Sequence, residues 1–450
     1  MILDIKKIYG KFVNSSSFSS LLLALTQSFI ALFFIVIDFF YSKELSVSDF
    51  GNWKQMYFLI NLGIPLLSLG IPEGYKYFLA KEGKPKEIFS NTFLFILFIT
   101  GILLVICLFV NLFHCYGWIN IKQYYLISFL FPIAYFSFGI SRVLRYAYIN
   151  EKKVMLFAKI NIFFSIVTFL IIGIVYLNFQ EIKGYYLLVG LLLLIIVFEL
   201  SNTTLLYKLH LSIHPKWLNK DFFVKVLGQG LPLYLATFIG TLSINLDKSI
   251  VSFFESKETF AIFSVGALEI PIVARLSAAF SLNIYPQLVT LIDQNKKDQA
   301  KKLWIHTTTN VSYITFPMIL VLMFFAKDII YLVYSPKYEK SVFLFQTYLL
   351  VGLFRNNSYG ALIAASGKTK FITLYSLITL ASNLILSLIL YKIIGIEGIV
   401  FGSLFSIIII NFLQLNHEDL LKMYFKNFFL NPKIFIMVVI IISYYLIQCL

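Results

Sequence analysis

Apolar runs of about 20 residues recur along the whole chain, and they limit its possible folds more than any other feature. Polar breaks separate thirteen such runs, each long enough to cross a bilayer as an α-helix. The runs are continuous rather than alternating, so strands are not expected. They lie approximately at residues 18–40, 50–71, 88–112, 124–147, 154–177, 185–207, 227–253, 260–286, 303–326, 341–365, 371–391, 396–415 and 433–449.

Composition excludes several classes of protein. The chain has 450 residues, of which 59% are hydrophobic and 13% are charged. A soluble domain is nearer to about half apolar and about a quarter charged, so a soluble enzyme, a secreted disulfide scaffold and a disordered chain are all excluded. The 3 cysteines form no CxxC pair, and neither a P-loop nor a GxGxxG motif is present. We therefore expect no metal site, no cofactor and no ATP hydrolysis in this chain.

The net charge of +15 is best explained by membrane topology. In a soluble protein such a charge would favour nucleic acid as a partner. Here 24 Lys and Arg residues lie in the breaks on one side of the expected membrane and 8 on the other, and the bias alternates with every break. Positive residues in short loops stay in the cytoplasm. We therefore expect a multi-pass protein with its N-terminus in the cytoplasm, and no nucleic-acid partner.

Two halves of the chain carry similar features in the same order. The second run opens with Phe50-Gly51 and the eighth with Phe260-Ala261, and each run leads into a lysine-rich break. Ordered matches of this kind indicate an internal repeat. Six spans in each half would relate the halves by an axis along the membrane normal, with a substrate site between them. We expect an N-terminal six-helix bundle at 1–215, a C-terminal six-helix bundle at 216–420, and a cytoplasmic linker with an extra terminal transmembrane helix at 421–450.

Several segments resemble the multidrug/oligosaccharidyl-lipid/polysaccharide exporter superfamily, and within it the Wzx-type polysaccharide flippases. The Asp247-Lys248 pair is similar to an acid–base pair in the seventh span of that family. The resemblance covers about residues 15–415, and the segments that carry it are 50–51, 69–71, 245–248, 285–286, 353–368, 382–384 and 395–398. It implies an all-α polytopic fold of two pseudo-symmetric six-helix bundles around a central cavity, with about 12–13 transmembrane helices in all.

Charged residues inside the expected spans are the candidate site residues. A charge at the bilayer centre costs at least about 2.5–3.5 kcal/mol, so it normally faces a cavity or a partner. Arg offers paired donors to phosphate oxygens, and a carboxylate out of water can take up and release a proton or hold a cation. We expect a cavity that binds diphosphate and sugar through Arg275, Arg355, Lys248 and Lys54. The candidates for ion coupling are Asp247 and Glu269, although each could instead pair with a basic residue to hold helices together.

The resemblance implies a flippase that carries undecaprenyl-diphosphate-linked oligosaccharide repeat units across the bacterial cytoplasmic (inner) membrane for surface polysaccharide such as O-antigen. Its partners would be that lipid-linked oligosaccharide, membrane lipids and, by analogy, a polysaccharide polymerase. Two alternatives stay open. One is an ion-coupled drug or cation antiporter of the same superfamily, and the other is a membrane enzyme acting on polyprenyl-linked sugars. The short breaks between spans leave no room for an external catalytic domain, so we expect a transporter rather than an enzyme.

Overall fold

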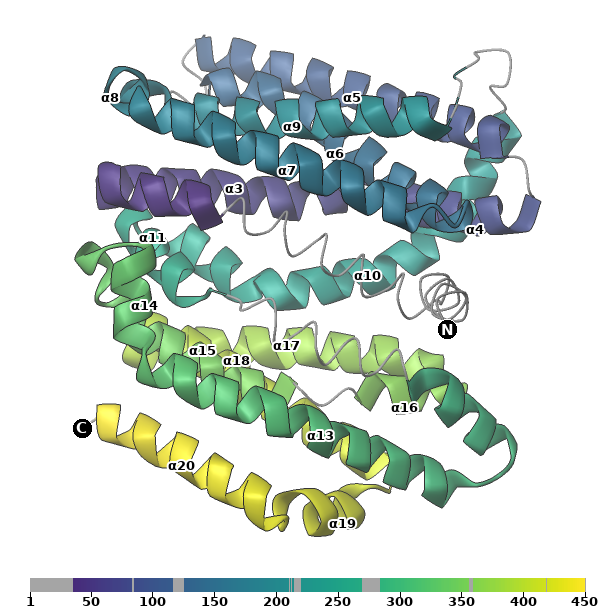
Figure 1. The fold of residues 1–450 in the computed structure, drawn as a ribbon, viewed down its shortest axis with the longest axis vertical. Helices are drawn as coiled ribbons and strands as arrows, with labels where there is room; N and C mark the ends of the chain where they lie inside the picture. Colours follow the sequence, from purple (N-terminus) through teal and green to yellow (C-terminus); the bar gives the residue numbers. More distant parts are fainter. Residues whose placement is uncertain are drawn as a thin grey trace, which may run out of the picture. The chain divides into compact units, whose positions relative to one another are not determined.

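The computed structural model describes residues 35–82, 85–115, 125–209, 211, 213, 220–268, 284–355, 359–417 and 419–449. Within these ranges the chain is almost entirely helical and has no strand, which confirms the all-α prediction (Figure 1). Contacts divide the chain into two compact units. Unit 1 comprises Met1–Tyr41 and Gln55–Phe238, and unit 2 comprises Ser42–Lys54 and Ile239–Leu450.

Helices α3 and α10 each contribute residues to both units. Helix α3 spans Val47–Leu67 and α10 spans Lys220–Phe254, so the boundary at residues 54 and 55 divides α3 and the boundary at 238 and 239 divides α10. These units describe packing, whereas the expected bundles at 1–215 and 216–420 describe a sequence repeat. The repeat stays a prediction.

Unit 1 is a bundle of long apolar helices. Helix α6 lies at its centre, because it packs against α4, α5, α7 and α9, and α7 also packs against α9. Besides its parts of α3 and α10, unit 1 contains α4 (Ile71–Glu82), α5 (Pro85–Cys115), α6 (Tyr125–Asn150), α7 (Val154–Leu177), the short α8 (Phe179–Ile182) and α9 (Tyr186–Leu209).

Unit 2 is built around α15 and the helical pair α17–α18. Helix α15 packs against α11, α13, α14 and α18, and α13 also packs against α20. The helices of unit 2 are α11 (Lys257–Gly266), α13 (Lys297–Phe324), α14 (Ala326–Val333), α15 (Ser341–Arg355), α16 (Tyr359–Ala365), α17 (Thr369–Ile394), α18 (Ile396–His417), α19 (Leu421–Tyr424), the π-helical η4 (Phe425–Phe429) and α20 (Pro432–Cys449).

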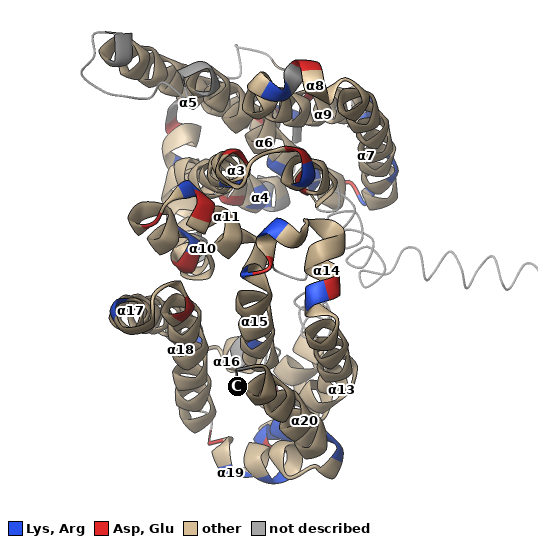
Figure 2. Ribbon diagram, turned by 90° about the vertical axis from the view of Figure 1, so that its left-hand side faces the viewer, with Lys and Arg blue, Asp and Glu red and all other residues tan. Residues whose placement is uncertain are grey.

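Six helices of the described chain are long and apolar enough to cross a membrane, and the number rises to eight if two bent pairs each count as one span. Helix α7 has the bounds expected from the sequence, and α5, α9, α17 and α18 lie within about three residues of theirs. Helix α13 begins at Lys297, whereas its run was expected to begin at residue 303. The expected terminal run at 433–449 is helix α20. Most of the ribbon carries no charge (Figure 2), as lipid contact requires. The chain is a multi-pass membrane protein.

The bent pair α3–α4 breaks where the sequence predicts one run, at 50–71. Helix α3 ends at Leu67, α4 begins at Ile71, and the two are inclined by 50°. Leu69 and Gly70 both have positive φ, 48° and 77°, which ends the helix because an α-helix cannot continue through the left-handed region. A positive φ is uncommon in a residue other than glycine, so Leu69 marks the break as a locally strained turn.

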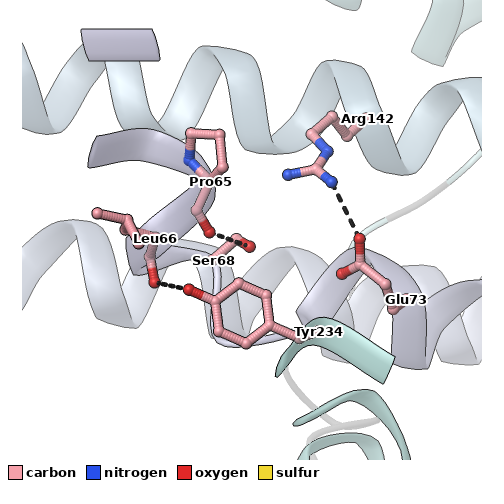
Figure 3. Close-up of polar contacts among 6 residues, drawn as sticks. All are labelled: Pro65, Leu66, Ser68, Glu73, Arg142 and Tyr234. Atoms are coloured by element: carbon pink, nitrogen blue, oxygen red, sulfur yellow. Dashed lines mark hydrogen bonds and ion pairs between the residues drawn. The ribbon is translucent and has the colours of Figure 1, made fainter. Parts of the chain in front are cut away.

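Tyrosine hydroxyls satisfy the carbonyls that the break leaves without helical partners. Tyr234 of α10 donates to the Leu66 carbonyl, and Tyr135 of α6 donates to the Leu67 carbonyl over 3.2 Å. Figure 3 shows the Tyr234 contact, together with the Ser68 hydroxyl that donates to the Pro65 carbonyl over 2.8 Å. Because hydrocarbon offers no water to exposed carbonyls, these bonds allow the helix to break inside the bundle.

Two further contacts fix the α4 side of the break. Arg142 of α6 and Glu73 of α4 form an ion pair with 2.9 Å between Nη2 and Oε1 (Figure 3). Gly230 of α10 lies directly against Gly70, and a Cβ added to Gly230 would come within 2.1 Å of the Gly70 carbonyl oxygen. The backbones of α10 and the break therefore touch without side chains between them, as small residues permit in membrane bundles.

Replacing Gly230 with alanine should destabilise unit 1. The added methyl group has no room against the Gly70 carbonyl, and such overpacking costs about 1–3 kcal/mol. The unfolding midpoint in detergent micelles measures the effect. Gly228 is the matched control on the same helix, because a Cβ there meets nothing within 4 Å. Gly228→Ala should leave stability unchanged or raise it slightly. Equal midpoints for Gly230→Ala and Gly228→Ala would contradict the tight contact.

Candidate functional site

A buried carboxylate forms the centre of the candidate site in unit 2. Asp247 lies on α10 with only 3% of its surface exposed. The Ser403 hydroxyl donates to it, with Oγ 2.8 Å from Oδ1 and 2.7 Å from Oδ2. Tyr348 donates its hydroxyl to Oδ2 over 2.6 Å, and Asn383 donates an amide hydrogen to Oδ1 over 3.2 Å. One carboxylate thus joins α10 to α15, α17 and α18.

A second layer of hydrogen bonds orients these partners. The Asn383 amide also donates to the Ser403 oxygen over 3.0 Å. Ser387 lies one turn further along α17 and bonds to the Asn383 side-chain oxygen at 2.8 Å and to the Ile399 carbonyl at 3.1 Å. Gly402 allows this close approach of α17 and α18, because a Cβ there would lie 2.4 Å from the Ser387 hydroxyl oxygen. The site is therefore held by a connected network rather than by isolated bonds.

The hydrogen-bond partners of Asp247 are neutral side chains, not the basic residues that the sequence offers. Arg355 ends α15 with an exposed side chain, and its charge lies near enough to act electrostatically on Asp247. Lys248 follows Asp247 on α10 and is half-buried. Successive helical residues point about 100° apart, so the two side chains face different neighbours. The structure thus brings Asp247, Arg355 and Lys248 into one region of unit 2.

Lys54 occupies a separate aromatic environment in unit 2. Its Nζ lies 5.6 Å from the centre of the Phe50 ring and 5.9 Å from that of Tyr334. Both rings are fully buried and meet edge to face. A cation over ring faces gains about 0.5–2 kcal/mol depending on its desolvation. These cation–π contacts give Lys54 a packing role whatever its role in substrate binding.

Two of the expected site residues, Arg275 and Glu269, lie outside the described residues. Their roles in the cavity and in ion coupling stay predictions. Among the residues that the structure describes, no group of three or more His, Cys, Asp and Glu side chains could hold a metal ion.

Unit 1 contains its own intramembrane carboxylate, Glu199 of α9. The Ser137 hydroxyl of α6 donates to Glu199, and the Ser137 carbonyl accepts from the Asn202 amide over 2.9 Å. On the other side of α9, Ser201 donates to the Asn161 side-chain oxygen of α7 over 3.3 Å. These bonds cross-link three helices of the bundle, as polar side chains commonly do in membranes.

Sequence reasoning selected Asp247 from its charge but did not identify the side chains that hold it. Asn383 and Ser387 are polar residues four apart in an otherwise apolar run, which places them on one helix face. This spacing in the sequence indicates a polar face that could contact a buried charge. Ser403 and Tyr348 have no such pattern, and only the packing of α15 and α18 against α10 brings them to Asp247.

The hydrogen bonds to Asp247 should contribute measurably to stability. Ser403→Ala removes one donor, and interhelical bonds of this kind are worth about 1–2 kcal/mol in membranes. Unfolding in mixed micelles should therefore show a loss of that size. Ser376→Ala on α17 is the control, because its hydroxyl bonds only to the Ile372 carbonyl of its own helix at 3.0 Å. In an Asp247→Ala background, Ser403→Ala should cost far less. Additive losses would contradict the bond.

The chain matches a family model described as "Polysaccharide biosynthesis protein" over residues 44–343, which is more than half of its length. A comparison with curated protein sequences finds no match.

Several solved structures share the fold. An inward-facing MATE family multidrug resistance transporter of the MOP superfamily aligns at TM-score 0.67 and 13% identity, covering 90% of this chain and 98% of that one. The lipid II flippase MurJ in an inward closed conformation aligns at TM-score 0.68 and 14% identity, covering 95% and 97%. A MOP superfamily transporter from Pyrococcus furiosus, whose title describes a binding pocket of reverse polarity, aligns at 0.61 and 12%, covering 90% and 95%.

The residues matched by the family model include the Asp247 region and all of α10, and the fold similarity extends over nine-tenths of the chain. This chain therefore belongs to the polysaccharide biosynthesis protein family and has the all-α fold of MOP superfamily transporters.

Proposed function

We propose that this protein is a flippase for undecaprenyl-diphosphate-linked oligosaccharide repeat units in the bacterial cytoplasmic membrane. The observation that carries the proposal is the combination of a polysaccharide biosynthesis family with a fold shared by a lipid II flippase. Membership of that family supports a glycan as cargo, and the fold supports transport of a lipid-linked form. The lysine-rich breaks support a cytoplasmic N-terminus.

The basic residues of the spans would bind the head group. In the proposed mechanism a diphosphate enters from the cytoplasmic face and is held by Arg275 and Arg355, whose guanidinium groups offer paired donors to phosphate oxygens. Lys248 and Lys54 add positive charge. Alternating access then exposes the sugar outside while the polyprenyl tail stays in the bilayer. Each step is binding or reorientation, so the protein acts as a transporter and makes no covalent bond.

Asp247 is the proposed site of ion coupling. Its carboxylate and the hydroxyl oxygens of Ser403 and Tyr348 offer oxygen ligands in a buried region, and such ligands suit either a proton or a small hard cation. Binding there would change the packing of α10 against α15, α17 and α18. Glu269 stays a second coupling candidate from the sequence.

The two alternative functions, an antiporter and a membrane enzyme, can each be distinguished from a flippase by an assay. A drug or cation antiporter of the same fold would move organic cations, which an efflux assay in whole cells detects. A membrane enzyme would convert labelled lipid-linked sugar into a new covalent product, which chromatography detects. A polysaccharide polymerase as a partner follows from the flippase proposal alone.

Removing the two candidate arginines should stop glycan export. Arg355→Ala and Arg275→Ala should each insert normally but reduce surface glycan by about tenfold or more, because a charge-assisted bond to phosphate contributes about 1.5–3 kcal/mol. Immunoblotting of surface polysaccharide measures the effect in cells that lack the native protein. Lys370→Ala, in the first turn of α17, is the control and should keep full export. Full glycan in both arginine variants would contradict the head-group assignment.

Asp247 should be needed for gradient-driven transport but not for folding. In proteoliposomes with an imposed pH or Na⁺ gradient, the native protein should flip a fluorescent lipid-linked sugar faster than without the gradient. Asp247→Asn keeps the shape of the side chain but should lose this stimulation. Tyr348→Phe removes one hydrogen bond and leaves the carboxylate in place, so it should still respond. Equal stimulation in Asp247→Asn and the native protein would refute coupling at Asp247.

A further inference from the structure

An apolar groove lies beside the C-terminal linker of unit 2, and among the described residues none of those in the transport proposal lines it. Its volume is about 520 Å³, within the range of about 300–1,000 Å³ typical of ligand pockets. Helix α18 forms one wall with Ile408, Asn411, Phe412 and Leu415, and Phe354 closes the end. Asn411 fixes that end, because its amide donates to the Phe354 carbonyl over 2.9 Å.

The opposite wall is segment 421–429, which comprises α19 and η4. This segment is inclined by 82° to α20, so it lies near the plane of the membrane if α20 crosses the bilayer. One face of it is anchored to unit 2. Tyr424 is buried, and its ring lies 5.8 Å from that of Trp304 on α13, while Phe428 meets Phe316 edge to face at 6.3 Å.

The other face of segment 421–429 opens into the groove and combines apolar rings with positive charge. Phe425 and Phe429 line the groove together with Lys422 and Lys426, which lie four residues apart on the same face of the segment. Both lysines are exposed, and Figure 2 shows basic ribbon beside α19. None of the described residues that line the groove is acidic.

We propose that this groove is a binding site for an anionic phospholipid of the surrounding bilayer. An acyl chain would occupy the apolar space between α18 and segment 421–429, and the phosphate would lie at Lys422 and Lys426. Basic pockets at the cytoplasmic ends of transmembrane helices bind anionic head groups in this way. The distribution of lysines predicts that this end of α18 faces the cytoplasmic leaflet.

Because of the position of the groove, a bound lipid would affect how the helices of unit 2 pack together. Phe354 immediately precedes Arg355 at the end of α15, and Asn411 ties that end to α18. A lipid wedged between α18 and segment 421–429 would hold α13, α15 and α18 together at their shared end. The inference does not depend on the flippase proposal, because it requires only that α20 and its neighbours lie in a bilayer.

Lipid binding to the full-length protein tests the proposal directly. Native mass spectrometry from a neutral detergent should show tighter binding of phosphatidylglycerol than of phosphatidylcholine, and no retention of sn-glycerol 1-phosphate, which lacks an acyl chain. Lys422→Gln combined with Lys426→Gln should weaken phosphatidylglycerol binding by about fivefold for each lysine. The double variant Lys422→Arg and Lys426→Arg keeps both positive charges, so it should bind phosphatidylglycerol as the native protein does. The control Lys433→Gln, at the start of α20 and outside the groove, should bind as the native protein does.

Three results would overturn the proposal. Unchanged phosphatidylglycerol binding by the double glutamine variant would show that the two lysines do not hold the phosphate. Unchanged binding by Ile408→Trp, which fills the groove from α18, would show that no chain lies there. Displacement of phosphatidylglycerol by undecaprenyl phosphate at equal or lower concentration would assign the groove to a polyprenyl tail instead. Unfolding midpoints measured without added lipid distinguish these results from misfolding.

Discussion

The absence of water from the bilayer core is the constraint on which the rest of this structure depends. In hydrocarbon every buried polar group needs a partner within the protein, and an unpaired one costs several kcal/mol. Asp247 meets this requirement with three neutral side chains from three helices. The break after α3 meets it with the hydroxyls of Tyr234 and Tyr135. The same requirement thus explains the candidate site and the irregular backbone.

Polar cross-links also determine which helices can move independently of one another. Helices α17 and α18 are joined by Asn383, Ser387, Ser403 and the close approach at Gly402, so they should move as one body. Helix α10 is joined to this pair by Asp247 within the helix and, at its C-terminal end, by Phe254 and Glu255, which contact Tyr391 of α17. A change in the bonding of Asp247 would therefore alter the attachment of α10 while leaving the α17–α18 pair intact. This arrangement is what an ion-responsive element requires.

The sequence predicted the helices well, because each span is a continuous apolar run bounded by polar residues. It placed α7 at its observed bounds and correctly gave an all-α membrane fold. It treated 50–71 as one run because the break depends on partners remote in sequence, with Tyr234 lying 168 residues from Leu66. The site was predicted in part. A charge within a span identified Asp247, but Ser403 lies 156 residues away, and no local pattern predicts that contact.

The chemistry of the Asp247 partners has one more consequence. Two of the three are hydroxyls, and a hydroxyl can rotate from donating a hydrogen bond to accepting one. If Asp247 gained a proton, the hydroxyl of Tyr348 or Ser403 could rotate and accept a hydrogen bond from the protonated carboxyl group, without any movement of the backbone. The Asn383 amide group cannot reverse in this way unless its side chain flips. The two hydroxyl partners of Asp247 are therefore compatible with both charge states of that residue.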